Sequence, residues 1–295
     1  AGAMPRWRRV MLKAWRSGIG LLALAWVTWA GAQPPAPSPT ARPVVRVAVV
    51  GGLLQSGVWP RLADKAAVGA GLRVDTVAAA PKEGIVPVFS RGDADLMLIH
   101  GSDESYALLA AGLAAPLRAW AANEHVLVGP PDDPAGVAQA ADGAAAMARI
   151  IAADAPLLAF RDPGSFIIAQ ALFRRAGVRP GPRQQLYDDA ESPQSVLVSA
   201  ARQGAYAVVG HIPVASGKMP SHGLKVLLHG DPAMRRVYVL VEPGPAHPAN
   251  AERRRLARRL ADYLLSARGQ ADLRAADREA GGPWVFALTT SGPAR

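Results

Sequence analysis

The sequence predicts an α/β protein, and two observations support this. Short apolar runs of strand length recur from residue 44 onward, and stretches with the apolar spacing of helices separate them. The chain has 295 residues, of which 50% are hydrophobic, which suffices for a sizeable core or for two lobes of ordinary domain size. We therefore expect parallel sheets with helices covering their faces.

The first half of the chain contains four predicted strands. The run at 44–50 consists of valine and alanine with one arginine, and glycines follow it. Further apolar runs predict strands at 72–77, 94–99 and 125–128, of which the last ends at a Gly-Pro-Pro turn. Helical spacing follows the first strand and recurs at 102–111 and 138–153.

The second half continues the alternation with shorter strands. We expect strands at 157–160, 206–209, 224–228 and 237–241, because each is a short apolar run between polar turns. Helical spacing predicts helices at 166–176, 196–203 and 251–266. Residues 251–266 form the last long helix that we predict, and we find no internal repeat.

The N-terminal segment has the three parts of a secretory signal. Basic residues from Arg8 to Arg16 precede an apolar stretch at 19–29, and Ala-Gly-Ala at 30–32 provides a small-residue cleavage site. We assign residues 1–32 to a signal peptide cleaved before Gln33, and residues 33–43 to a proline-rich tether. The expected location is periplasmic; an uncleaved membrane anchor is the alternative.

The formal charge of +10 does not indicate a nucleic-acid-binding protein. Five of the 33 basic residues lie in the first 16 positions, which leaves 28 basic against 23 acidic residues in the rest. Five arginines between 253 and 259 lie on one predicted helix, either as a solvated face or as a contact surface for a transporter or anionic lipid. We expect no nucleic-acid partner. The chain has no cysteine, which excludes disulfides and cysteine-based metal sites.

Three loops follow predicted strands at positions where α/β sheets bind ligands. They contain Gly51 and Gly52, His100 and Gly101, and the segment from Arg161 through Gly164 to Ser165. In the third loop, unpaired N–H groups at the start of the following helix favour an anion, and Arg161 adds a positive charge. These loops predict an anion site; an ordinary strand–helix turn with an exposed arginine is the alternative.

An ordered series of short motifs resembles the TupA-like extracellular tungstate-binding proteins of ABC transporters. The series runs through nearly all of residues 44–288, and a looser similarity to molybdate-binding proteins accompanies it. Its members are Gln55-Ser56-Gly57, Arg91-Gly92-Asp93-Ala94-Asp95, Asp132-Asp133-Pro134-Ala135-Gly136, Ala176-Gly177, Ala205-Tyr206, Gly230-Asp231-Pro232-Ala233, Tyr263-Leu264-Leu265-Ser266 and Gly269-Gln270.

The resemblance implies a type II periplasmic binding protein fold, with two α/β lobes joined by two crossover segments and a ligand cleft between the lobes. Lobe one is then expected at 44–121 and 243–288, lobe two at 131–235, and the hinge crossovers at 122–130 and 236–242. It also implies a monomeric receptor that captures a small oxyanion, such as tungstate or molybdate, by cleft closure and delivers it to the permease of an ABC transporter.

The expected ligand-binding residues are Gly51, Gly52, His100, Gly101, Arg161, Gly164 and Ser165. The family usually carries threonines and serines after the first strand, whereas residues 49–53 of this chain contain no hydroxyl group. Because an under-satisfied buried oxyanion is costly, either the glycine N–H groups suffice or the ligand differs. Another small anion such as an organic acid, or a sensory role, therefore remains open.

Catalytic and metal-binding patterns are weak in this sequence. The six histidines form no i, i+4 pair, and Gly-x-Ser-x-Gly does not occur. We expect no catalytic residues, no metal and no cofactor. A metal site assembled from distant loops and a hydrolase on a similar scaffold are the alternatives that we keep.

Overall fold

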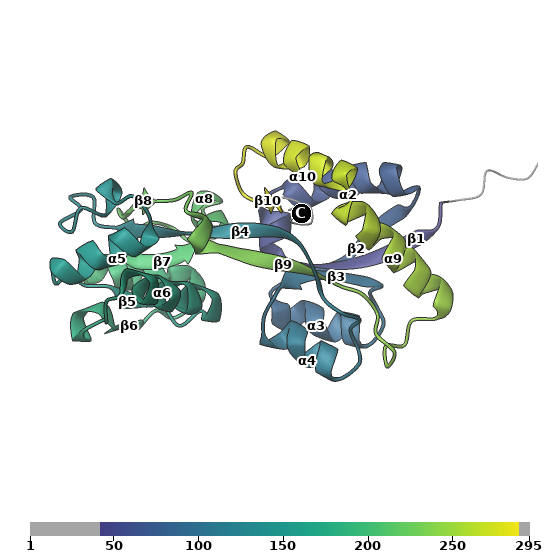
Figure 1. The fold of residues 1–295 in the computed structure, drawn as a ribbon, viewed down its shortest axis with the longest axis horizontal. Coiled ribbons are helices and arrows are strands. Elements are labelled where there is room, and N and C mark those ends of the chain that lie inside the picture. The colour runs from purple at the N-terminus through teal and green to yellow at the C-terminus, as the bar shows by residue number, and fades with distance from the viewer. Residues whose placement is uncertain (1–41, 289–295) are drawn as a thin grey trace, which may run out of the picture. The chain divides into compact units, whose positions relative to one another are not determined.

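The computed structural model describes residues 42–288 (Figure 1). The predicted signal peptide and residues 33–41 of the predicted tether lie outside the described residues. An eight-stranded sheet has the order β10-β4-β9-β3-β1-β2, with β7 and β8 also pairing with β4. Its strands are β1 (Val44–Val50), β2 (Arg73–Ala80), β3 (Leu96–His100), β4 (Arg118–Gly129), β7 (Ala207–Gly210), β8 (Lys225–Leu228), β9 (Arg235–Val241) and β10 (Phe286–Ala287).

Six helices accompany the β1–β3 part of the sheet. They are α1 (Gly51–Gln55), α2 (Val58–Ala70), α3 (Lys82–Ser90), α4 (Asp103–Ala110), α9 (Ala251–Leu265) and α10 (Ala267–Glu279). Successive side chains of each strand point to opposite faces of the sheet and pack into two different cores. Val47 and Leu98 belong to a core with α2, α9 and α10, whereas Ala48 and Met97 belong to a core with α3 and α4. The sheet of this lobe is therefore covered on both faces (Figure 1).

A second group of elements surrounds the far end of β4 and β7. It comprises a small parallel pair, β5 (Leu158–Ala159) and β6 (Leu186–Tyr187), with α5 (Gly143–Ala152), α6 (Pro163–Ala176), α7 (Val196–Arg202) and α8 (His211–Ala215). Leu127 of β4 packs into a core with α5 and α6, and its neighbours Val126 and Val128 pack into a core with α7. Each of these four cores draws its buried residues from only one of the two groups.

Strands β4 and β9 run side by side from one group to the other (Figure 1). One strand carries the chain into the second lobe and the other carries it back, so the two must pair antiparallel. The expected parallel pairing therefore holds for only part of the large sheet: β2, β1 and β3 are parallel, but every strand that pairs with β4 or β9 is antiparallel to it. The α/β class and the two lobes joined by two crossovers are confirmed, while the lobe boundaries stay a prediction.

Two further differences from the sequence prediction concern the C-terminal half. The last long helix is α10, not α9, because Ser266 ends α9 and caps α10 by accepting a hydrogen bond from the Gly269 amide at 3.0 Å. The helix α8 was also missed, since five residues are too few to show a helical period. Among the described residues, no helix is long and apolar enough to cross a membrane.

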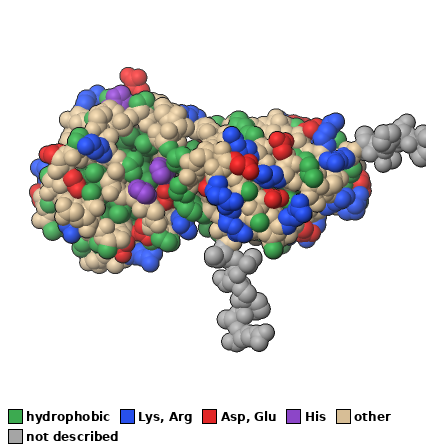
Figure 2. Space-filling view, turned by 90° about the horizontal axis from the view of Figure 1, so that it is seen from above, with side chains coloured by type: hydrophobic (Ala, Val, Ile, Leu, Met, Phe, Trp, Pro, Cys, Tyr) green, Lys and Arg blue, Asp and Glu red, His purple; other side chains and the backbone are tan. Residues whose placement is uncertain are grey.

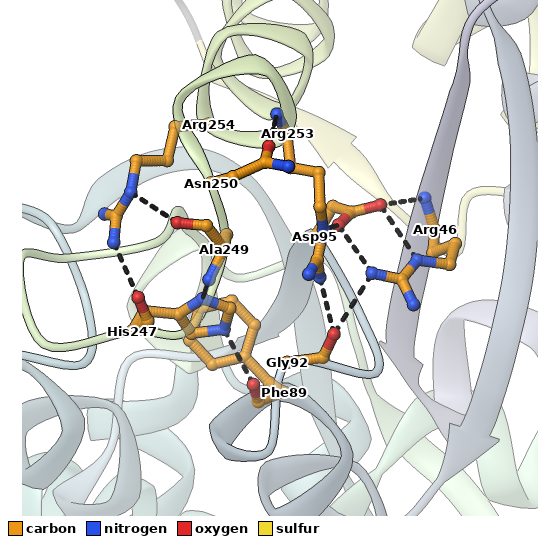
Figure 3. A network of polar contacts seen from close by, with 9 residues as sticks. All are labelled: Arg46, Phe89, Gly92, Asp95, His247, Ala249, Asn250, Arg253 and Arg254. Carbon is orange, nitrogen blue, oxygen red and sulfur yellow. Dashed lines mark hydrogen bonds and ion pairs between the residues drawn. The ribbon is translucent and has the colours of Figure 1, made fainter.

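Most of the arginine run on α9 has structural partners (Figure 3). The Arg253 Nε donates to Asp95 at 2.6 Å, and Asp95 also pairs with Arg46 at 3.0 Å. The Arg254 guanidinium donates to the carbonyl oxygens of Ala249 and His247, at 2.9 and 2.6 Å. These two side chains bind the start of α9 to neighbouring turns, which accounts for them without a transporter or a lipid.

The remaining basic side chains of this region are mixed with acidic ones. Figure 2 shows Lys and Arg gathered on one half of the face that it displays, with Asp and Glu between them. Arg255 pairs with Glu252 at 2.7 Å, Lys65 with Glu279 at 2.9 Å, and Arg258 with Glu242. This alternation of sign is typical of a solvated helical surface.

Candidate ligand-binding site

A cavity of about 240 Å³ lies where the two lobes meet β4 and β9. Its polar lining comes from α1, the end of β3, β4, β9, the start of α6 and the segments before α7 and after α8. It consists of Gln55, His100, Asn123, His125, Asp162, Ser165, Gln194, Lys218, Arg236 and Tyr238. A second hollow adjoins it, and His100, Asp162, Gln194 and Arg236 line both. Because both lobes contribute, we call the two hollows together the cleft.

Two neutral histidines lie in the cavity wall. The His100 Nε2 lies 3.0 Å from the Asn123 side-chain oxygen, and the His100 ring stacks on Tyr238 with centroids 4.3 Å apart. Burial, followed by the positive charge of Arg236, lowers the pKa of His100 to about 3 and that of His125 to about 4. Both rings are therefore uncharged at neutral pH and can act only as hydrogen-bond donors or acceptors.

Two buried polar atoms of the cavity have no hydrogen-bond partner among residues 42–288. These are the Tyr238 hydroxyl and the His125 Nδ1, both on residues that are less than a tenth exposed. An unsatisfied buried polar group costs about 1–3 kcal/mol, so such groups are uncommon unless water or a ligand meets them. Their position in the cavity wall indicates that this wall is built to meet a polar ligand.

Arg236 supplies the positive charge of the cavity. Burial lowers the pKa of its guanidinium, which remains charged, and the nearby Asp162 opposes that shift. Within the described part of the chain, the Arg236 side chain has no hydrogen bond or ion pair. A half-buried guanidinium without a counter-ion favours the approach of an anion.

The start of α6 is shaped around this guanidinium. A Cβ atom at Gly164 would lie 2.2 Å from the Arg236 Nη1, so only glycine leaves room for the side chain as it stands. Asp162 caps the helix, because its carboxylate accepts a hydrogen bond from the Ser165 amide at 2.9 Å. One of the N–H groups that were predicted to bind an anion therefore already donates to the Asp162 carboxylate.

The structure places the seven sequence-predicted residues as follows. Gly51, Gly52, His100 and Ser165 line the main cavity, and Gly164 lines the adjoining hollow. Gly101 lines neither, and its amide donates to the Val237 carbonyl oxygen at 3.0 Å. Arg161 also lines neither: its Nη2 donates to the Asp188 carbonyl oxygen at 3.0 Å, and its guanidinium lies over the Tyr187 ring, 4.6 Å from the centroid.

Sequence reasoning missed the part of the cavity that β4 and β9 provide. Asn123, His125, Arg236 and Tyr238 all come from these strands, which cross between the lobes. A signal was present at 123–125, where Asn-Glu-His interrupts a run that is otherwise apolar from 119 to 128. Polar side chains in a buried strand need partners, and here the cavity brings them together.

Glu124 of β4 does not line the cavity and ties α8 to β4. Its carboxylate lies 2.7 Å from the His211 Nδ1 and accepts a hydrogen bond from the Gly230 amide at 2.9 Å. Burial opposes ionisation, but the hydrogen bonds from His211 and Gly230 outweigh it and keep the pKa of Glu124 below its usual value. The His211 ring also meets Trp284 edge-on, with centroids 5.2 Å apart, so this pair connects the two lobes.

The comparison with protein families agrees with this architecture. Residues 70–276 match the family described as bacterial extracellular solute-binding protein. The chain belongs to this family. No curated protein is similar enough in sequence to be matched.

Solved structures with similar folds include two described as tungstate proteins. The tungstate ABC transporter protein from Geobacter sulfurreducens is 20% identical, with a TM-score of 0.61, and covers 79% of this chain and 98% of its own. The tungstate-binding protein TupA from Desulfovibrio alaskensis is also 20% identical, with a TM-score of 0.63 and coverage of 84% and 99%.

A third similar structure is the substrate-binding domain of a putative molybdenum ABC transporter from Clostridium difficile. It is 12% identical, with a TM-score of 0.54, and covers 83% of this chain and 99% of its own. At these identities the likeness concerns the fold, which in this extracellular solute-binding family member is of the type II periplasmic binding class.

Proposed function

We propose that this solute-binding protein captures a small anion in the cleft and delivers it to the permease of an ABC transporter. The observation that carries the proposal is Arg236, a half-buried cation in the cavity wall without a counter-ion among residues 42–288. The unpartnered Tyr238 hydroxyl and His125 Nδ1 lie in the same wall and can hydrogen-bond the anion. The protein binds and releases its ligand as a periplasmic monomer, without chemistry.

Cleft closure is the proposed mechanism. Gly52 and His100 belong to one lobe, Ser165 to the other, and Arg236 to the strand that joins them. A ligand that contacts all of these groups at once stabilises the arrangement in which the lobes are close together. The permease then distinguishes loaded from empty receptor by the lobe arrangement.

Tungstate and molybdate are the first ligands to test. The sequence resemblance implies them, and two structures of similar fold are described as tungstate proteins. In this proposal the ligand-binding groups are Arg236 and the five sequence-predicted residues that line the cleft, Gly51, Gly52, His100, Gly164 and Ser165. Gly101 and Arg161 stay predictions from the sequence. An organic anion is the second candidate, because the cavity wall also includes the apolar side chains of Phe160, Ile212, Pro213 and Met219.

Isothermal titration calorimetry with tungstate, molybdate, sulfate, phosphate and carboxylates tests the proposal. We expect at least one anion to bind and Arg236→Gln to weaken it roughly tenfold to a hundredfold, the effect of losing a hydrogen bond to a charged group. Arg235→Gln is the matched control, because the Arg235 guanidinium lies over the Phe286 ring, 3.9 Å from the centroid. The proposal fails if no anion binds or if both variants bind equally well.

The same titrations compare two arginines. The sequence analysis predicts that Arg161→Ala weakens anion binding, whereas the cavity lining predicts that effect for Arg236→Gln. In this structure the Arg161 guanidinium is held by Asp188 and Tyr187. An equal loss of anion affinity in both variants would mean that the Arg161 side chain turns into the cleft when the cleft closes.

A further inference from the structure

We propose that the ligand of the cleft is a singly charged organic anion with an apolar body, such as a monocarboxylate. This inference rests on the proposed function and names the class of ligand for the same site. Three features carry it: the net charge of the cavity wall, the position of the Asp162 carboxylate, and the apolar side chains of the same wall.

The charged side chains of the cavity wall leave a net positive charge that one negative charge on the ligand balances. Arg236 and Lys218 are positive, Asp162 is negative, and the lining histidines are neutral at pH 7. The adjoining hollow adds the exposed Glu83 and Lys82, whose charge is already paired with Glu104 at 2.6 Å. A monoanion neutralises this wall, whereas a dianion leaves one buried negative charge unpaired, which is costly.

Asp162 also limits the donors that an oxyanion needs. Its carboxylate takes the Ser165 amide, the N–H group that a tetrahedral anion at the start of α6 would use, and it repels a second negative charge. The hydroxyl groups in the wall are those of Ser165 and Tyr238. With the Arg236 guanidinium these are enough donors for one carboxylate, which accepts a bidentate arginine and further hydrogen bonds.

Besides these groups and the polar side chains named above, the wall has apolar side chains from both lobes. Val50 and Pro81 lie on the lobe-one side, and the lobe-two side includes Phe160, Ile212 and Met219. Small-molecule sites typically combine such a surface with a few polar groups that fix the ligand's orientation. A bare oxyanion leaves this surface without a partner, whereas the hydrocarbon part of an organic acid buries it.

Calorimetry with a series of probes tests the inference: acetate, butanoate, hexanoate and benzoate against tungstate and sulfate, on protein unfolded and refolded to remove bound ligand. We expect affinity to rise by up to about fourfold for each added CH₂ group until the cavity is full. Arg236→Gln weakens every carboxylate, and Arg235→Gln weakens none.

Two isosteric variants examine the apolar wall. Met219→Gln and Val50→Thr change polarity with little change in size, one on each lobe, so a variant that fails to fold still leaves the other. Each reduces the gain in affinity from acetate to hexanoate, since the wall then offers less apolar surface to the hydrocarbon chain. An unchanged gain in both variants overturns the assignment of the apolar wall.

The Asp162→Asn variant examines the charge. Asparagine caps helices as well as aspartate does, so α6 is preserved while one negative charge is lost. We expect the affinity for sulfate or tungstate to rise relative to that for hexanoate. If tungstate binds the unmodified protein more tightly than every carboxylate, and does so through Arg236, the inference is wrong and the proposed function stands. If no probe binds, the proposed function falls as well.

Discussion

At the scale of single residues, carboxylate partners distinguish Arg46 and Arg253 from Arg236. Asp95 is 3% exposed and receives both Arg46 and Arg253 (Figure 3). Arg236 is half-buried like Arg46 and Arg253, but it has no carboxylate partner of this kind in the described residues, and it lines the cleft. A charge that the fold leaves unpaired in a cavity is more informative about function than one that the fold has neutralised.

Removing the Asp95 carboxylate tests how much its ion pairs with Arg46 and Arg253 stabilise the fold. We expect Asp95→Asn to lower the free energy of unfolding by about 2–3 kcal/mol, less than for a fully buried pair because both arginines reach solvent. Urea denaturation measures this. Asp75→Asn is the control: the Arg73–Asp75 pair is exposed, so its loss costs less than about 1 kcal/mol.

The contribution of the Asp95 carboxylate to the free energy of unfolding also depends on pH. Burial opposes ionisation of Asp95, but hydrogen bonds from Arg46 and Arg253 outweigh it and lower its pKa. A carboxylate with a lowered folded-state pKa stabilises the fold above its unfolded pKa of about 3.9, and this is lost as pH falls through the folded value. The difference between wild type and Asp95→Asn should thus be constant from pH 5 to 8 and shrink below about pH 4.

At the scale of elements, the start of α6 and the strands β4 and β9 build the site together. Helix α6 contributes Ser165 and the Asp162 cap, and its Gly164 leaves space for the Arg236 guanidinium from β9. The strands contribute the neutral histidine His125 and the Tyr238 hydroxyl. The site therefore depends on how a helix start fits against a strand.

Gly164→Ala tests this fit. The added methyl group meets the flexible end of Arg236, so the guanidinium moves while the helix keeps its form. We expect anion affinity to fall severalfold, with the unfolding midpoint in urea little changed, because alanine is a better helix former than glycine. Ala169→Gly on the same helix is the comparison. Full anion affinity in Gly164→Ala would show that the position of Arg236 is not critical.

At the scale of the whole molecule, β4 and β9 are the two chain segments that carry the crossovers between the lobes. The four cores stay within one lobe or the other, so a small bend in these strands can move the lobes without repacking a core. The contact of the His211 ring with Trp284 joins the two lobes and changes if the lobes move.

Closure of the cleft predicts a more compact molecule in the presence of ligand. Small-angle X-ray scattering should give a smaller radius of gyration when a saturating anion is added, because a ligand held by both lobes favours the closed arrangement. Arg236→Gln, at the same ligand concentration, should retain the larger radius. An unchanged radius in the protein that binds the anion would argue against closure.

Export is a second prediction at this scale. The basic, apolar and Ala-Gly-Ala segments predict cleavage after Ala32, so mass spectrometry of periplasmic material should find Gln33 at the N-terminus. The intact segment in the membrane fraction would instead support the uncleaved anchor. Ala32→Leu, which removes the small residue at the cleavage position, is the matched control and should leave the segment in place.

The sequence by itself determined the α/β class, most strands and helices, and the family, because apolar periodicity and local turn residues are properties of short segments. Gly51, Gly52, His100 and Ser165, which line the cavity, were also predicted from the sequence, since they lie between predicted strands and the segments that follow them. Only the tertiary structure decided that Arg236, rather than Arg161, lines the cleft, and that Asp162 faces it. Which charges remain unpaired depends on contacts between residues far apart in the chain, such as Gly164 with Arg236, and no local pattern records them.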